Sequence, residues 1–225
     1  YYAHCSALDH CVGELLKTIK EAGIEDNTLF VFTSDHGDML WSQGHHRKQR
    51  PWEESVRVPF LLKYPALLGK QPKVLDALID APDLMPTLLG LAGLPVPPGV
   101  EGLDYSDFIR GGKDPSDGSA VLMCPHPFGE FTRKEGGMEY RGLKTKRYTY
   151  VKNLQGPWLF FDNGKDPFQM NNLVGNPTYA QQQREVDERL QRRLKEMKDE
   201  FLPGNDYIRK WGYVTNPSGT INYTN

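Results

Sequence analysis

No run of apolar residues in this sequence approaches the roughly 20 residues that a membrane-spanning helix needs. The two most hydrophobic stretches, around Phe30 and Phe60, are short and bounded by charged residues. The sequence also lacks an excess of one charge sign, because it has 27 Lys and Arg and 29 Asp and Glu, for a formal net charge of -2. No bulk field therefore attracts nucleic acid or an anionic membrane. We expect neither a membrane span nor a nucleic-acid partner.

Cysteine is scarce, with Cys5, Cys11 and Cys124 as the three in the chain. Cys5 and Cys11 lie six positions apart in a segment with helical periodicity, on poorly matched faces for a disulfide. We expect all three to be small buried hydrophobic residues. The sequence begins with Tyr1 and not with Met, and its first residues show no targeting signal. We therefore expect the chain to be a piece of a longer protein.

Helix and strand patterns alternate in the first half of the chain. Residues 7–19 predict an amphipathic helix with Gly23 as its C-terminal cap, because apolar residues recur there at helical spacing. The short apolar runs at residues 28–34 and 58–62 are typical of strands covered on both faces in a parallel sheet. A second helix is predicted after Asp80, its expected N-cap.

The second half of the chain differs in character. The segments "YRGLKTKRYTYVKN" and "PWLFFDN" predict antiparallel strands with one covered face. Residues 177–202 predict a long amphipathic helix that ends at Gly204. In the C-terminal tail, Asn222-Tyr223-Thr224 fits the glycosylation triplet, a pattern of low specificity.

Together these patterns predict an α/β fold in two domains. Residues 1–115 are expected to form part of an α/β sandwich, with a mostly parallel sheet and flanking helices. Residues 116–225 are expected to form a small α+β subdomain with an antiparallel sheet and a long helix.

Asp35 and His36 directly follow the first predicted strand. Ligands gather outside the carboxyl ends of strands in open α/β sheets. Gly37 is expected to let the backbone turn tightly, so that both side chains converge on one centre. An ordinary solvated turn is the alternative for a bare Asp-His-Gly triplet. The "GHHRK" that follows, residues 44–48, adds imidazoles and bases and favours an oxyanion site.

The stretch "TSDHGDMLWSQGHHRKQRPWEESVRVPFLLKYP" resembles the second metal-binding segment of the sulfatases, within the alkaline phosphatase superfamily. The segments before and after it extend the resemblance over most of the chain, namely "SALDHCVGELLKTIKEAGIEDNTLFVFTSDHG", "LIDAPDLMPTLLGLAGLPVPPGVEGLDYSDFIRG" and "LFFDNGKDPFQMNNLV". The resemblance implies an alkaline-phosphatase-like sandwich and a hydrolase of sulfate esters.

Carried over to this sequence, the resemblance makes Asp35 and His36 metal-site residues. It makes Lys48 the catalytic cation that binds the sulfate and bridging oxygens. Calcium is the usual metal of the family, but imidazole matches calcium poorly, so the identity of the metal stays open. His45 and His46 are candidates for substrate binding and for donating a proton to the leaving alcohol, because histidine titrates near neutral pH.

Sulfatases cleave with a formylglycine made from Cys or Ser in a C-x-P-S-R type motif, and no such motif occurs here. The paired aspartates that complete the metal site are also missing. The resemblance therefore implies the C-terminal portion of a sulfatase, inactive as this isolated chain. We also expect self-association, because the first helix and strand lack their packing partners.

Two alternatives stay open: a phosphodiester or phosphonate monoester hydrolase of the same superfamily, and a non-catalytic binding module or pseudoenzyme. The expected substrate is a sulfated small molecule or glycan, and His126 in "CPHPFGEF" is a candidate wall of its pocket. The family further implies an exported, periplasmic or extracellular protein, or a lysosomal one.

Overall fold

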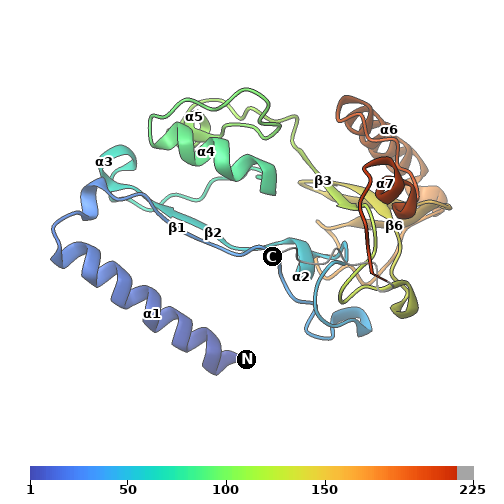
Figure 1. Cartoon of the computed structure of the whole chain (residues 1–225), viewed down its shortest axis with the longest axis horizontal. Helices are drawn as coiled ribbons and strands as arrows, with labels where there is room; N and C mark the ends of the chain where they lie inside the picture. Colours follow the sequence, from blue (N-terminus) through green and yellow to red (C-terminus); the bar gives the residue numbers. More distant parts are fainter. Residues whose placement is uncertain (217–225) are drawn as a thin grey trace. The chain divides into compact units, whose positions relative to one another are not determined.

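The computed structural model describes residues 1–216, so the triplet at Asn222 lies outside the described residues. The chain forms two compact units. Unit 1 comprises residues 1–34, 59–77 and 81–115, and unit 2 comprises residues 35–58, 78–80 and the chain from residue 116 onward. Figure 1 labels the main elements of both units. Within the described part of the chain, no helix has the length and apolar character needed to cross a membrane.

Unit 1 contains α1 (Tyr2–Glu21), η1 (Glu25–Asn27), β1 (Phe30–Thr33), β2 (Phe60–Lys63), α3 (Pro65–Leu68), η3 (Ala81–Asp83), α4 (Leu84–Leu91) and α5 (Ser106–Ile109). Unit 2 contains η2 (Ser42–Gly44), α2 (Glu53–Val56), β3 (Ser119–Cys124), η4 (Arg133–Glu135), β4 (Tyr140–Thr145), β5 (Tyr148–Asn153), β6 (Gly156–Asp162), η5 (Pro177–Tyr179), α6 (Ala180–Glu196) and α7 (Gly204–Lys210). The predicted α/β class is confirmed.

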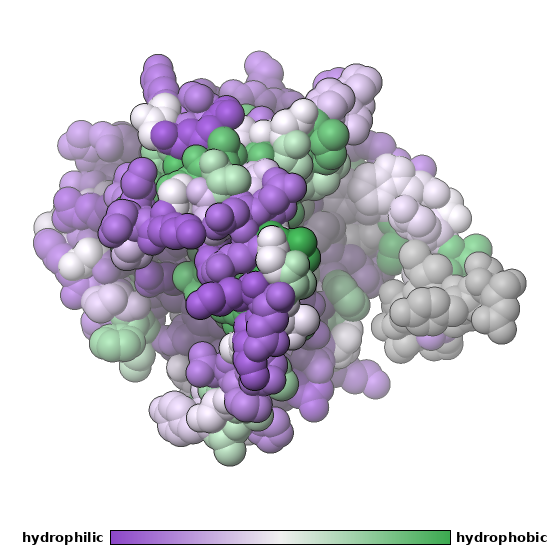
Figure 2. Space-filling view, turned by 90° about the vertical axis from the view of Figure 1, so that its left-hand side faces the viewer, coloured by the Kyte–Doolittle hydropathy of each residue, from purple (hydrophilic) through white to green (hydrophobic). Residues whose placement is uncertain are grey.

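The first predicted helix is confirmed as α1, with Gly23 in the left-handed region just after its end (φ +69°). None of its residues is buried, and Leu8 and Leu15 are more than half exposed. Figure 2 shows green hydrophobic patches between hydrophilic residues on the face that it views. The expectation that Cys5 and Cys11 are buried is therefore wrong, because no element covers this helix among the described residues.

Cys124 differs from the other two cysteines. It is buried at the end of β3, and burial raises the pKa of its thiol to about 11. The side chain is therefore an unreactive packing group at neutral pH, as the sequence predicted for it.

The strands predicted at residues 28–34 and 58–62 are confirmed as β1 and β2, but the expected parallel arrangement is wrong for this pair. They pair antiparallel, with Phe30 opposite Lys63 and Thr33 opposite Phe60. The two strands form a two-stranded sheet in the described chain, and their residues are only partly buried. An apolar run indicates burial and carries no information on strand direction.

The second helix begins later than the sequence predicted. Asp83, not Asp80, is the N-cap of α4, and a 3-10 turn precedes it. The carboxylate of Asp83 accepts a hydrogen bond from the backbone N–H of Leu103 at 2.7 Å. This buried contact joins the start of α4 to the loop after it and fixes where the helix begins.

Unit 2 is built on a four-stranded antiparallel sheet in the order β3-β4-β5-β6. Strands β4, β5 and β6 confirm the prediction from the two aromatic segments, whereas β3 was not predicted. Val121 pairs with Leu143, and Leu143 pairs with Tyr150. Each strand pairs with its neighbour in sequence, and the connection from β3 to β4 is the longest because it includes η4.

Both faces of this sheet are covered. One face packs against α6, as Figure 1 shows, in a core of Val121, Leu143, Tyr150, Phe160, Val186, Leu190 and Leu194. The other face packs against residues 35–58, from which Met39 and Trp52 enter a core with Cys124, Phe131, Tyr140, Val151, Leu159 and Phe161. Residues 35–58 were expected in the first domain, and their contacts place them in unit 2. The division into domains 1–115 and 116–225 stays a prediction.

The long C-terminal helix is confirmed but is shorter than predicted. Helix α6 ends at Glu196, and Gly204 begins α7 instead of ending the long helix. Lys198 and Phe201 adopt left-handed backbone conformations, with φ of 56° and 51°. Asp199 between them is held by side-chain contacts to the sheet. The helix stops because this tertiary contact outweighs the local amphipathic pattern.

Candidate functional site

Asp35, His36 and Lys48 come together in unit 2. The Lys48 Nζ lies 2.9 Å from His36 Nε2, and Asp35 Oδ2 lies 3.6 Å from the same nitrogen. His36 Nδ1 lies 2.7 Å from the carbonyl oxygen of Gly37. With the proton on Nδ1, the ring donates to this carbonyl and its Nε2 lone pair accepts from the Lys48 ammonium. The Nε2 of His36 therefore faces both the Lys48 ammonium and the Asp35 carboxylate.

Gly37 is required by a close backbone approach, and its predicted role in a tight turn needs correction. Its N–H donates to the carbonyl oxygen of Ser55 at 2.9 Å. A Cβ at this position would lie 1.9 Å from the carbonyl oxygen of Glu54. Residue 37 is absent from the positive-φ residues, so steric space and not backbone conformation demands glycine here.

The loop that carries Lys48 is held by its own backbone. Met39 N–H donates to the carbonyl oxygen of Arg47 at 2.8 Å, and Met39 itself is fully buried. The Asp38 carboxylate accepts hydrogen bonds from Leu40 N–H at 2.8 Å and Arg47 N–H at 3.2 Å. These contacts close residues 38–47 into a loop and place Lys48 directly after its closing bond.

Arg50 is a positioning residue that the sequence analysis missed. Its guanidinium, which is 3% exposed, donates to the carbonyl oxygens of His46 at 2.9 Å and Lys48 at 3.0 Å. It also lies over the Phe131 ring at 5.0 Å. Arg50 therefore fixes the backbone on both sides of Arg47. No local signal distinguishes it, because it follows two other basic residues in the same loop.

His45 and His46 lie on aromatic rings. The His45 ring centroid is 5.1 Å from that of Trp52, and the His46 centroid is 5.0 Å from that of Trp41. Burial, followed by the charges of Arg50 and His46, lowers the pKa of His45. A lowered pKa leaves less of the imidazolium form at neutral pH, which weakens His45 as a proton donor. Both roles stay predictions.

His126 lies apart from the bonds that join the cluster. It follows β3 and packs at the start of α7, where a Cβ on Gly204 would approach its Nδ1 to 2.4 Å. This nitrogen is buried without a hydrogen-bond partner. Burial, followed by the charge of Arg133, lowers the pKa of His126. These contacts are typical of a packed side chain, and its role as a pocket wall stays a prediction.

The two lowered histidine pKa values predict that the protein loses stability on mild acidification. A group whose pKa is lower in the folded state binds fewer protons there than in the unfolded chain. The stabilising contribution is complete above the ordinary pKa of 6.5 and is lost as the pH falls through the lowered value. We expect the free energy of unfolding in urea to fall between pH 7.5 and pH 5.

His45→Gln and His126→Gln should each reduce this pH dependence, and His10→Gln on the exposed face of α1 should not. The lowered carboxyl pKa values of Asp162 and Asp199 act only in more acidic solution, so they do not mask the effect. Equal unfolding free energies of the unmodified chain at pH 7.5 and pH 5 would contradict this expectation.

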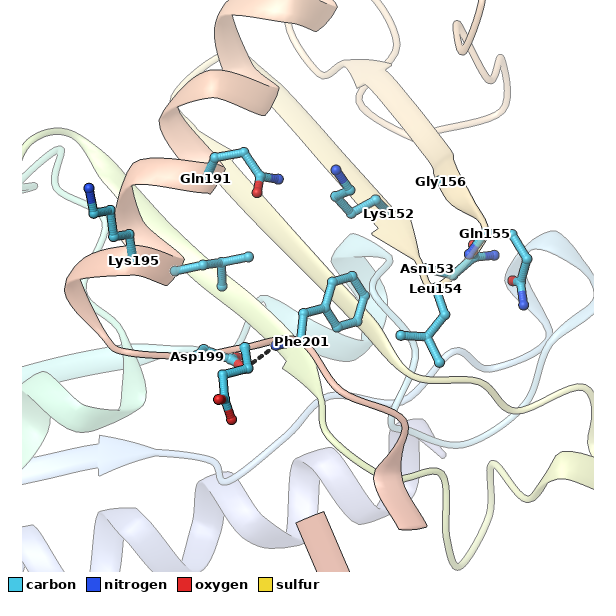
Figure 3. A pocket seen from close by; sticks show the side chains of 11 residues that line it. Lys152, Asn153, Leu154, Gln155, Gly156, Gln191, Lys195, Asp199 and Phe201 are labelled. Carbon is cyan, nitrogen blue, oxygen red and sulfur yellow. Dashed lines mark hydrogen bonds between the residues drawn. The ribbon is translucent and has the colours of Figure 1, made fainter. Parts of the chain in front are cut away.

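A hollow of about 630 Å³ lies elsewhere in unit 2, between the β5–β6 turn and the end of α6. Figure 3 shows Lys152, Lys195, Asp199 and Phe201 around it. Lys152 pairs with Asp187, and Asp199 pairs with Arg141. Its charged groups therefore serve the fold, and none of the predicted site residues lines it.

The cluster fits part of a metal site. Asp35 offers a carboxylate that is 85% exposed, and His36 Nε2 could bind a metal ion only by giving up its contact with Lys48. Among residues 1–216, no group of three or more His, Cys, Asp or Glu side chains is arranged to hold a metal ion. Calcium takes six to eight oxygen ligands. Asp35 and His36 would therefore supply two ligands, with most of the shell coming from elsewhere.

Residues 1–94, which include this cluster, match the family model described as Sulfatase. The chain is also 41% identical over 219 residues to an ulvan-active sulfatase of Formosa agariphila, an alignment that covers 95% of this chain. Residues 1–94 are therefore similar to the sulfatase family, and the similarity to this one sulfatase extends over most of the chain. The chain spans 42% of the length of that relative.

Solved structures share the fold of this chain. A protein in complex with its substrate D-glucosamine-2-N,6-O-disulfate has a TM-score of 0.75 and 28% identity, and the match covers 91% of this chain and 41% of that one. A phosphonate monoester hydrolase from Silicibacter pomeroyi has a TM-score of 0.70 and 27% identity, and the match covers 86% and 40%. Sulfatases and phosphonate hydrolases thus share this architecture.

Proposed function

We propose that this chain is the C-terminal portion of a sulfatase that hydrolyses sulfate esters of a glycan. The observation that carries the proposal is the convergence of Asp35, His36 and Lys48 within 3.6 Å contacts on a loop held by Arg50. The ulvan-active relative and the glucosamine disulfate complex support a sulfated sugar as the substrate. A metal site and a formylglycine are expected from the family, with calcium as the expected ion.

Lys48 is proposed to bind the sulfate and bridging oxygens of the ester. Hydrolysis breaks the bond between sulfur and the bridging oxygen, water supplies the new oxygen on sulfur, and the alcohol leaves with a proton. An ammonium group has three N–H donors. One Lys48 donor is directed at His36 Nε2, which leaves the others for oxygens that gain negative charge as the bond breaks. A divalent cation at Asp35 would polarise the same sulfuryl group, and His36 would join its ligands only by releasing the Lys48 donor.

The test is to read the coding DNA that precedes Tyr1 and to assay the protein extended by it. We expect a Cys or Ser in a C-x-P-S-R type motif and turnover of 4-nitrophenyl sulfate, with no turnover by the 225-residue chain alone. Lys48→Met in the extended protein should lower kcat/KM by about 10²-fold or more. The exposed Lys113→Met is the matched control. Turnover by the isolated chain would refute the proposal.

The structural likeness to a phosphonate monoester hydrolase keeps one alternative substrate in view. A different nucleophile upstream, with faster turnover of phosphonate monoesters than of sulfate esters, would establish that alternative. A non-catalytic binding module would show no metal-dependent rise in the melting temperature, even in the extended protein.

Self-association and localisation are also proposals. The uncovered side chains of Leu8 and Leu15 on α1 support self-association of the isolated chain through this helix. A concentration-independent monomer mass in light scattering would contradict it. The family supports an exported, periplasmic or extracellular location, or a lysosomal one, for the whole protein.

A further inference from the structure

Large apolar side chains are exposed on two loops of unit 2, one at residues 40–41 and the other at residues 168–170. Trp41 is 71% exposed, Phe168 72% and Met170 67%. Leu40, beside Trp41, is 51% exposed. Exposed apolar groups that gather in one place, with charges beside them, mark a binding surface more often than single scattered ones do.

The two loops are tied together by Gln43. Its side-chain amide donates to the carbonyl oxygen of Phe168 at 2.7 Å and lies 3.9 Å from the sulfur of Met170. Trp41 is two positions from Gln43 in the chain. The exposed rings of Trp41 and Phe168 therefore belong to one joined surface, although 127 positions separate them in the sequence.

Each loop fixes its exposed ring through a buried neighbour. Met39, just before Leu40 and Trp41, is 0% exposed, and Gln169, between Phe168 and Met170, is 2% exposed. The Gln169 amide accepts from Glu53 N–H and donates to the Asn163 side chain, both at 2.9 Å. The backbone beside each exposed ring is therefore held in place before any ligand arrives, which lowers the entropic cost of binding.

Backbone strain is concentrated in the same loop. Leu40, Trp41, Gln43, Arg47 and Gln49 all have positive φ, between 46° and 70°, and none of them is glycine. Such conformations are unfavourable for residues with a Cβ and persist where a loop is fixed for binding or catalysis. Burial of the Trp41 ring does not offset the unfavourable backbone conformation of that residue, because the ring is mostly exposed.

We propose that Trp41 and Phe168 form an aromatic platform that stacks on a sugar ring of the sulfated oligosaccharide whose ester binds at Lys48. A pyranose presents a face of C–H bonds with partial positive charge, which matches the negative face of an indole or phenyl ring. His46, 5.0 Å from Trp41 at a tilt of 35°, supports the indole. Lys48 supplies positive charge on the same loop for the sulfate group, whereas the exposed Arg47 is already paired with Glu130. This platform deepens the proposed function and rests on it for the sulfate at Lys48.

The test is a titration of the 225-residue chain with an ulvan-derived sulfated oligosaccharide, followed through the indole N–H signals of its four tryptophans. The Trp41 signal, assigned by its loss in Trp41→Phe, should move and saturate. Trp41→Ala and Phe168→Ala should each weaken binding about tenfold, because loss of one stacking contact is worth about 1.4 kcal/mol. Trp41→Phe should retain most of the affinity, and Trp211→Ala, which removes the exposed tryptophan just after α7, should retain all of it.

A Trp41 signal that does not move at millimolar oligosaccharide overturns the platform, and so does unchanged affinity in Trp41→Ala. Hydrolysis is not part of this readout, so failure of the platform is separate from failure of the sulfatase proposal. If the extended protein cleaves sulfate esters while the Trp41 signal stays fixed, the platform alone fails. If Trp41 binds the desulfated oligosaccharide as tightly as the sulfated one, the platform stands and its link to Lys48 fails.

Discussion

Replacing Arg141 with Met is expected to lower the free energy of unfolding by about 3–5 kcal/mol, because it leaves a buried charge without its partner. Arg141 is 1% exposed and forms an ion pair with Asp199, whose side chain is 12% exposed. It also donates to the carbonyl oxygens of Cys124 at 3.2 Å and Tyr140 at 2.9 Å. The Met variant keeps the volume near the Phe201 ring and removes all of these donors.

The ionisation of Asp199 depends on its pairing with Arg141. Burial opposes ionisation of its carboxyl group, but the hydrogen bonds from Arg141 and Tyr207 outweigh burial and lower the pKa. The same carboxylate accepts from Phe201 N–H at 2.9 Å and so holds the segment between α6 and α7. We therefore expect Arg141→Met to loosen this segment, seen as faster amide exchange in α7.

The matched control is Lys17→Met, which breaks a 4.0 Å pair with Glu21 on the exposed surface of α1. Its cost should stay below about 0.5 kcal/mol. A double variant that also replaces Asp199 with Leu should be more stable than the sum of the two single effects predicts, because no unpaired charge remains. Urea unfolding of Arg141→Met within 1 kcal/mol of the unmodified chain would count against the argument.

Gly37→Ala is expected to destabilise the protein by about 3 kcal/mol or more and to separate His36 from Lys48. The added carbon would lie 1.9 Å from the Glu54 carbonyl oxygen and 2.9 Å from the Glu54 carbonyl carbon, both backbone atoms that no rotamer change can move away. The hydrogen bond from Gly37 N–H to Ser55 would have to lengthen. Urea unfolding measures the loss of stability, and the chemical shifts of the His36 ring report the loss of its contact with Lys48.

Gly13→Ala is the informative control because it should act in the opposite direction. Gly13 lies in the middle of α1, and a Cβ there meets nothing within 4 Å. Alanine should stabilise the helix by about 0.5–1 kcal/mol. If both variants changed stability by the same small amount, the close approach at Gly37 would not constrain the site.

The sequence predicted the elements whose signal is local. Helix α1 and strand β1 each follow from the spacing of their own apolar residues, and β4 to β6 follow from aromatic segments between turns. The sequence placed Asp35 and His36 together after the first strand, and the resemblance added Lys48; in unit 2 both Asp35 and Lys48 lie beside His36. The metal and substrate roles of these side chains stay predictions.

The features that the sequence did not reveal depend on distant contacts. The end of α6 is set by Asp199 binding Arg141, 58 positions away. In the sequence Arg50 is one basic residue among several, and only its hydrogen bonds to the carbonyl oxygens of His46 and Lys48 reveal its role. The direction of pairing between β1 and β2 and the place of residues 35–58 on the C-terminal sheet also lie beyond any local pattern.

Residues 35–58 pack on a sheet that is synthesised after them, so their synthesis and their folding are separated in time. The hydrogen bond from Glu53 N–H needs Gln169, which is synthesised 116 residues later. The hydrogen bond from Gln43 needs Phe168, which is synthesised 125 residues later. At about 5–20 residues per second, the first of these delays is roughly 6–23 s. During that interval Met39 and Trp52 have no sheet to enter, and a nascent chain with unburied apolar groups is prone to aggregate. The residues of the candidate site are therefore synthesised early, but residues 35–58 can fold only after the C-terminal sheet has been made.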